Sequence, residues 1–250
     1  MKTNLILLAA LGATAAAVLL MLVPEGNLAA AQSRPVAENG PPVLVELFTS
    51  QGCSSCPPAD RVLEKINLQA AVVAISRPVT YWDRLGWKDT LARPANDERQ
   101  RRYAARGLPG GGVYTPEAVV QGRHAVVGSD EAQLRRLIAG ARKIRPMALT
   151  QSGGRVTSTR AAPGSELNFI AVAARRHVGV KAGENGRRQL GYTNVVLNEV
   201  AVACSPKVAC SAAVPLAIAN QPGADRWAVV LQRVDHGPVE AVRWISRTAK

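Results

Sequence analysis

Residues 43–60 read VLVELFTSQGCSSCPPAD, and this stretch decides the fold class that the sequence predicts. It begins with an almost continuous apolar run, which is typical of a strand covered on both faces. Apolar residues then recur at helical spacing, at Ala59, Val62, Leu63 and Ile66. A second apolar run follows at residues 71–75. The pattern therefore predicts a strand, a helix and a second strand that lies parallel to the first.

The pattern of an α/β domain continues along the chain. A helix is expected at residues 94–106, followed by a hairpin of two short strands at 118–121 and 124–127. Ser129-Asp130 is suited to cap a last helix, which carries apolar residues at helical spacing. We therefore expect a domain over residues 42–145 with the element order β-α-β-α-β-β-α.

After Pro146 the sequence changes to short β-rich runs that are separated by turn signals. These runs lie at residues 155–159, 167–173, 195–203, 227–233 and 239–245. The spacing predicts that residues 146–250 form a small all-β, sandwich-like domain. The predicted fold is thus an α/β domain followed by a β-rich one.

The N-terminal segment has the features of an export signal. No charged residue occurs between Lys2 and Glu25, and the 19 residues 5–23 are mostly Leu, Ala and Val. We expect this segment to direct the chain out of the cytosol. A helix of this length also comes close to the thickness of the bilayer core, so an uncleaved membrane anchor is the alternative.

A cleavage site follows the apolar segment. Ala29 and Ala31 form a small-x-small pattern before Gln32, which suits cleavage at that point. Residues 1–31 are therefore expected to be a signal peptide. Residues 32–41 contain prolines, Asn and Gly and are expected to form a linker.

The chain is strongly basic, with 31 Lys and Arg residues against 18 Asp and Glu residues and a formal net charge of +13. Such a charge makes a polyanionic partner worth considering. The basic residues are nevertheless scattered, and they are not interleaved with aromatic residues in a nucleic-acid-binding motif. We interpret them as a solvated surface and expect no nucleic-acid partner.

Cys53 and Cys56 form a CxxC pair at the junction of the first predicted strand and helix. Unpaired N–H groups and the positive end of the helix dipole at such a junction stabilise a thiolate on the first cysteine. Pro57 and Pro58 fit the first helical turn, where a residue without an N–H is tolerated. In an exported chain this placement predicts a redox-active pair.

Two further features fit the same site. Glu46 lies inside the apolar strand, where burial is expected to raise its pKa and to let it exchange a proton with Cys56. The alternative is a hydrogen-bonded glutamate without a chemical role. Pro116 follows Thr115 and precedes a strand, which suits a cis peptide bond that holds a loop against the thiols. An ordinary trans proline is the alternative.

These motifs resemble a known family. The stretch from Glu46 to Asp60, the aromatic motifs at 81–83 and 86–89, and residues 112–116 resemble the exported bacterial family called domain of unknown function 1223. A strand that leads into CxxC, with Thr-Pro before a later hairpin, also resembles the thioredoxin fold. The resemblance implies a thioredoxin-like domain with an appended β domain, in a periplasmic or secreted bacterial protein.

The same resemblance implies roles for individual residues. Cys53 would be the nucleophile, Cys56 the resolving thiol, Glu46 the buried acid and Pro116 the cis proline, preceded by Thr115. The implied activity is thiol–disulfide exchange with protein thiols or disulfides. No cofactor and no bound metal are expected for it.

Other cysteines, histidines and aromatic residues leave alternatives open. Cys204 and Cys210 enclose a turn-like stretch and are expected to form a structural disulfide. A CxxC pair also binds Cu(I) well, and His124 is a candidate third ligand, so a copper carrier is one alternative function. A non-catalytic interaction module with a locked disulfide is another. Four aromatic residues are candidates to line a groove for a peptide partner near the thiols: Tyr81, Trp82, Trp87 and Tyr114. The alternative is that the two tryptophans only pack over the sheet.

Overall fold

The computed structural model describes residues 41–143, 147–205 and 209–247. The predicted signal peptide and nearly all of the predicted linker lie outside these residues. The elements in the first half of the described chain are β1 (Val43–Thr49), α1 (Cys56–Asn67), β2 (Val72–Pro78), the 3-10 helix η1 (Asp83–Leu85), α2 (Pro94–Ala105), β3 (Glu117–Val120), β4 (His124–Val127) and α3 (Glu131–Ala141). Apart from η1, their order is the β-α-β-α-β-β-α that the periodicities predict.

The second half is built mainly from strands. They are β5 (Leu149–Ser152), β6 (Arg155–Ser158), β7 (Ser165–Gly179), β8 (Gln189–Ala203), β9 (Ser211–Ala213), β10 (Arg226–Arg233) and β11 (Val239–Ile245), with the short helix α4 (Leu216–Ala219) between β9 and β10. The β-rich character expected after Pro146 is therefore present. In the part of the chain that the structure describes, no helix is long and apolar enough to cross a membrane.

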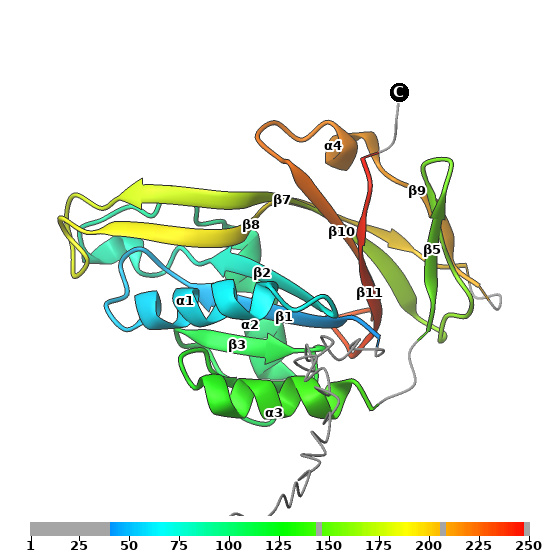
Figure 1. The fold of residues 1–250 in the computed structure, drawn as a ribbon, viewed down its shortest axis with the longest axis horizontal. Helices are drawn as coiled ribbons and strands as arrows, with labels where there is room; N and C mark the ends of the chain where they lie inside the picture. The colour runs from blue at the N-terminus through cyan, green and yellow to red at the C-terminus, as the bar shows by residue number, and fades with distance from the viewer. Residues whose placement is uncertain (1–40, 144–146, 206–208, 248–250) are drawn as a thin grey trace, which may run out of the picture. The chain divides into compact units, whose positions relative to one another are not determined.

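One large sheet contains strands from both halves of the chain, in the order β11-β10-β7-β8-β2-β1-β3-β4 (Figure 1). β1 and β2 are parallel, with Val43 opposite Val72, as the sequence predicts. β2 also pairs with β8 in parallel, where Ser76 lies opposite Val195. Four of the strands after residue 146, namely β7, β8, β10 and β11, thus continue the first sheet. Without β8, β2 would present an unpaired strand edge.

A second sheet, in the order β5-β6-β9, packs on the β-rich end of the large one. Leu149 and Val156 of the small sheet share a buried cluster with Phe169 of β7 and Val229 of β10. This part of the molecule has two packed sheets, as expected of a sandwich, but one of the two layers is the large shared sheet. Contacts accordingly group the described residues as one compact unit.

The strand β1 sends alternate side chains to opposite faces of the sheet. Val45 and Leu47 pack with α1 and α3, which Figure 1 shows on the same side of the sheet. Phe48 packs on the other face, where its ring meets Tyr103 of α2 edge to face. Asp130 accepts a hydrogen bond from Gln133 N at 2.9 Å and so caps α3, as predicted. The alternation of β1 decides which side chains can reach the site at the start of α1.

Candidate functional site

Cys53 and Cys56 are joined by a disulfide at the junction of β1 and α1. α1 begins at Cys56, Ser55 is its N-cap residue, and prolines occupy the first turn. The predicted placement of the CxxC pair is therefore confirmed. Ser55 makes no side-chain capping bond, and its hydroxyl lies 3.3 Å from the Sγ of Cys53 instead.

Neither cysteine is exposed to solvent, since the accessible fraction of each is 0%. The two residues between them, Ser54 and Ser55, are exposed. A thiol that attacks the disulfide therefore needs a local opening of the residues that cover it.

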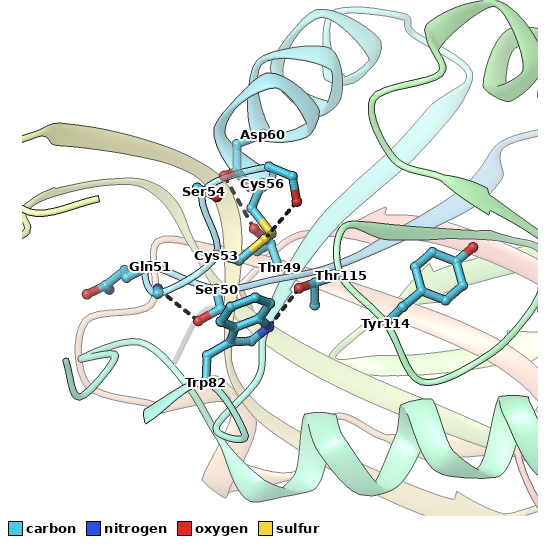
Figure 2. The surroundings of a disulfide bond; sticks show 12 residues. Thr49, Ser50, Gln51, Cys53, Ser54, Cys56, Asp60, Trp82, Tyr114 and Thr115 are labelled. Atoms are coloured by element: carbon cyan, nitrogen blue, oxygen red, sulfur yellow. Dashed lines mark hydrogen bonds between the residues drawn. A yellow bond between two sulfur atoms is a disulfide. The ribbon is translucent and has the colours of Figure 1, made fainter. Parts of the chain in front are cut away.

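The peptide bond between Thr115 and Pro116 is cis, which confirms the geometry predicted for it. Figure 2 shows Thr115 beside the disulfide, on a loop that comes from another part of the chain. The indole Nε1 of Trp82 donates to Thr115 Oγ1 at 2.8 Å. Trp82 also lies against the CxxC loop, because a Cβ added to Gly52 would be 3.1 Å from Trp82 Cβ. Trp82 thus links the two loops that meet at the disulfide.

Trp87 also contacts the CxxC loop. Its Nε1 donates to Oε1 of Gln51 at 2.8 Å, while the backbone N of Gln51 donates to Asp89 at 2.7 Å. Of the two readings of the aromatic cluster, these contacts favour packing for the tryptophans. Tyr114 is half-buried, and its hydroxyl donates to Gly110 O at 2.9 Å.

Glu117 follows the cis proline and is fully buried. Its carboxyl accepts hydrogen bonds from Gln100 Nε2 at 2.7 Å and from Gly112 N at 3.1 Å. Burial raises the pKa of Glu117 to about 7, although both hydrogen bonds favour the ionised form. Glu117 therefore ties the loop before Pro116 to α2.

The expectation that Glu46 has a raised pKa is wrong. Glu46 is fully buried, but it accepts hydrogen bonds from Arg77 Nε at 2.6 Å, Arg99 Nε at 2.7 Å and the Tyr103 hydroxyl at 2.5 Å. Burial alone would raise its pKa, yet the charges of Arg99 and Arg77 lower the pKa to about 2. A carboxylate held in this way is a poor proton donor near neutral pH.

The position of Glu46 explains this result. Glu46 lies between Val45 and Leu47 on β1, so its side chain points to the face opposite α1, toward α2. Its partner Arg99 also reaches Glu199 of β8 at 3.1 Å. The resulting charge cluster connects both halves of the chain in the core, and its members are Glu46, Arg77, Arg99, Tyr103, Glu199, Gln232 and His236.

Asp60 is a buried acid on the cysteine side of the sheet. It lies four residues after Cys56 on α1, hence on the same helix face, and Figure 2 shows it next to Cys56. Its Oδ2 accepts a hydrogen bond from Thr49 Oγ1 at 3.3 Å, and its Oδ1 has no partner among the described residues. Burial is the main cause that raises the pKa of Asp60 to about 8. Sequence reasoning missed Asp60, although its spacing from Cys56 was a usable signal.

The other cysteines, Cys204 and Cys210, form a second disulfide, as predicted. Ser158 of β6 donates from its backbone N to the carbonyl oxygen of Cys210 at 2.8 Å. The backbone N of Cys210 donates in turn to the Ser158 hydroxyl at 2.9 Å. His124, the candidate copper ligand, lies exposed on β4 opposite Val120. Within the described ranges, no group of three or more His, Cys, Asp and Glu side chains is arranged to hold a metal ion.

Fold and site together define a mixed α/β protein with a large sheet and a CxxC disulfide at a strand-to-helix junction. The chain belongs to the family described as protein of unknown function (DUF1223), whose model matches residues 44–232. The resemblance seen in the sequence motifs is thus confirmed for the family. Since the match ends in β10, it includes strands from both halves of the large sheet.

Relatives and solved structures add a second line of comparison. A protein of Archaeoglobus fulgidus named "Probable Thioredoxin" is 31% identical over 97 residues, which cover 38% of this chain and 86% of that protein. An X-ray crystal structure of a protein from Agrobacterium tumefaciens matches with a TM-score of 0.67 and 30% identity, over 84% of this chain and 96% of that one. The protein HBP35 of Porphyromonas gingivalis matches with a TM-score of 0.51 at 12% identity, over 83% of this chain and 75% of that one. At this identity the match indicates only that the two folds are similar.

Proposed function

We propose that this protein is a thiol–disulfide oxidoreductase that acts on the cysteines of other proteins through Cys53 and Cys56. The observation that carries the proposal is the CxxC disulfide at the start of α1, beside the loop of Thr115 and a buried acid, Asp60. The similarity to a protein named as a probable thioredoxin supports it. The redox reading needs no cofactor, because the two sulfurs carry the electrons themselves.

The exchange starts from the disulfide that the structure contains. A substrate thiolate attacks the Sγ of Cys53, the bond between the two cysteines breaks, and Cys56 leaves as a thiolate. A second substrate thiolate then attacks the substrate sulfur of the mixed disulfide and releases Cys53. The substrate loses two electrons and gains a disulfide, while the pair becomes a dithiol. Every step is reversible, so the reduction potential of the pair decides the direction.

Asp60 is suited to supply the proton that Cys56 needs. With a pKa of about 8, Asp60 is mostly protonated at neutral pH, and it lies one helical turn beyond Cys56. Its proton neutralises the leaving thiolate, and in the reverse direction its carboxylate takes the proton back. Asp60 therefore takes the role that the sequence predicted for Glu46.

The test is to trap the mixed disulfide. In Cys56→Ser the bond between substrate and Cys53 cannot be resolved internally, so covalent adducts with client proteins should accumulate and disappear on reduction. The double variant Cys53→Ser/Cys56→Ser is the matched control and should form none. If Cys56→Ser yields no adducts that depend on Cys53, the proposal fails.

A kinetic measurement tests the part assigned to Asp60. Asp60→Asn should slow the resolution of a preformed mixed disulfide at pH 7 by about a hundredfold, the scale of general acid–base catalysis. The loss should be smaller above pH 8, where hydroxide replaces the internal base. Equal resolution rates at pH 7 would remove Asp60 from the mechanism.

Export is part of the proposal as well. The apolar segment at residues 5–23 and the small residues before Gln32 support secretion into an oxidising compartment such as the bacterial periplasm. The partners there would be proteins with cysteine thiols or disulfides. Intact mass of the exported protein distinguishes a mature chain that begins at Gln32 from an uncleaved membrane anchor.

A further inference from the structure

The tip of the β7–β8 hairpin, residues 180–188, lies against the CxxC loop. Asn185 is fully buried, and its Nδ2 donates to the carbonyl oxygens of Cys53 at 2.8 Å and of Gln51 at 3.0 Å. Arg188 donates to Oδ1 of the same amide at 2.7 Å. The amide nitrogen of Asn185 therefore binds the CxxC loop, while its amide oxygen binds Arg188 of the hairpin tip. The hairpin tip is therefore docked on the residues next to the redox pair.

Glu184 from this tip contacts the residue that follows Cys53. Its Oε2 accepts a hydrogen bond from the backbone N of Ser54 at 2.9 Å. The bonds to Ser54 lower the pKa of Glu184, so its carboxylate is ionised over the range in which thiols titrate. A backbone N–H that could otherwise stabilise a thiolate on Cys53 is thereby engaged by an anion.

We propose that Glu184 is a positioning residue that lowers the reduction potential of the Cys53–Cys56 pair, because its docked carboxylate disfavours a thiolate on Cys53. This inference rests on the proposed redox function of the pair. It assigns a task to the long hairpin of the second half, which sequence reasoning did not connect with the cysteines.

Other charged groups near the pair do not have the same effect. The pKa of Asp60 on α1 is raised by burial to about 8, so this group carries little negative charge at neutral pH. Burial also raises the pKa of Asp89, which accepts a hydrogen bond from Gln51 N rather than from a residue of the CxxC pair. Cations in this region include Arg61, which acts on Asp60, and Arg188, which is bonded to Asn185. Lys181 and Arg187 lie on the same hairpin tip as Glu184. Glu184 is the carboxylate with a lowered pKa that contacts the CxxC segment directly.

The direction of the effect follows from the two redox states. A thiolate exists only in the reduced state, so a nearby anion destabilises that state and makes the disulfide harder to reduce. Removal of the charge should lower the pKa of the Cys53 thiol and raise the potential. The effect should grow as the pH rises through the pKa of Cys53, and it should shrink in 1 M salt.

The experiment compares Glu184→Gln with the unchanged protein. The amide retains an oxygen that can accept from Ser54 N, so the variant removes the charge and keeps the contact. The equilibrium with a glutathione series at pH 8 should shift toward the dithiol by about two- to fivefold, the scale of an exposed charge interaction, or by about 10 to 20 mV. The alkylation profile of Cys53 should move to lower pH. Glu98→Gln, an exposed change of equal charge on α2, should change neither.

A second variant tests whether docking is required. Asn185→Ala removes the amide that holds the tip to the loop, so it should release Glu184 and shift the equilibrium by itself. Adding Glu184→Gln to Asn185→Ala should then have little further effect. The inference is overturned if Glu184→Gln leaves both the potential and the alkylation profile unchanged, or if its effect persists undiminished in 1 M salt. Trapping with Cys56→Ser is independent of these values, so the two proposals can fail separately.

Discussion

Arg99 donates from Nε to Oε1 of Glu46 at 2.7 Å, and both side chains are buried. Arg77 donates to the same oxygen at 2.6 Å. Each guanidinium depends on this carboxylate for charge compensation in a part of the molecule that water does not reach. Glu46 is therefore a member of the core that joins the two halves of the chain.

Glu46→Gln should destabilise the protein by about 3 to 5 kcal/mol, because it leaves two buried arginines without their main counter-charge. Urea unfolding of the oxidised protein measures this cost. Tyr103→Phe, which removes one hydrogen bond to the same carboxylate, should cost about 1 to 3 kcal/mol. The reduction potential should stay within a twofold equilibrium change in both variants. A larger change of the reduction potential in Glu46→Gln would show that Glu46 does influence the redox pair.

Asp60→Asn should make the folded protein more stable at pH 8 and leave it unchanged below about pH 4. The pKa of Asp60 is raised from 3.8 to about 8, so the folded state holds a proton that the unfolded state releases. The stability that Asp60 contributes is fully present below pH 3.8 and is lost as the pH rises through 8. Thermal melts of the oxidised protein across this range should show the two curves diverging as pH increases. Parallel curves contradict the raised pKa.

Trp82→Phe should speed the reduction of the disulfide by dithiothreitol about two- to tenfold. The variant retains a ring beside the CxxC loop but loses the hydrogen bond from Nε1 to Thr115, whose net value of about 0.5 to 1.5 kcal/mol opposes local opening. Stopped-flow reduction kinetics provide the measurement. Tyr114→Phe loses a bond of similar length to Gly110 on an exposed edge and should react at the unchanged rate. If both variants behave alike, Trp82 does not control access.

Replacing both Cys204 and Cys210 with serine should cost about 2 kcal/mol of stability, the chain-entropy value for a short loop. The alkylation profile of Cys53 should not change, since this disulfide joins the segment after β8 to the residue before β9, beside β6, and does not lie on the CxxC loop. A changed profile would indicate that the second pair exchanges electrons with the first.

Local patterns predicted most of the first half of the fold. The apolar run of β1 and the helical spacing of α1 are properties of neighbouring residues, so they can be read directly. The same local patterns placed Cys53 and Cys56 at the helix start. The period of two along β1 also contained the information that Glu46 faces away from α1, since Val45 and Leu47 pack with that helix. The spacing of four residues between Cys56 and Asp60 could likewise have predicted that both lie on one face of α1.

Long-range pairings could not be read in this way. The parallel contact of β2 with β8 joins Ser76 to Val195, and no local pattern specifies which strand edge a later strand will cover. Likewise, Asn185 reaches Gln51 across 134 positions of the sequence. The second half was therefore recognised as β-rich, while its place in the shared sheet and on the CxxC loop was not.

The position of β2 between β1 and β8 has a practical consequence for anyone who wishes to produce the redox segment alone. A fragment that ends near residue 143 would uncover the edge of β2 where Ser76 pairs with β8, and it would leave the arginines that meet Glu199 with one acidic neighbour fewer. An unpaired strand edge of this kind can pair with another copy of the fragment, so we expect the fragment to aggregate during expression. A shortened soluble protein should therefore retain at least β7, β8 and β10, whether or not these strands contact a substrate protein.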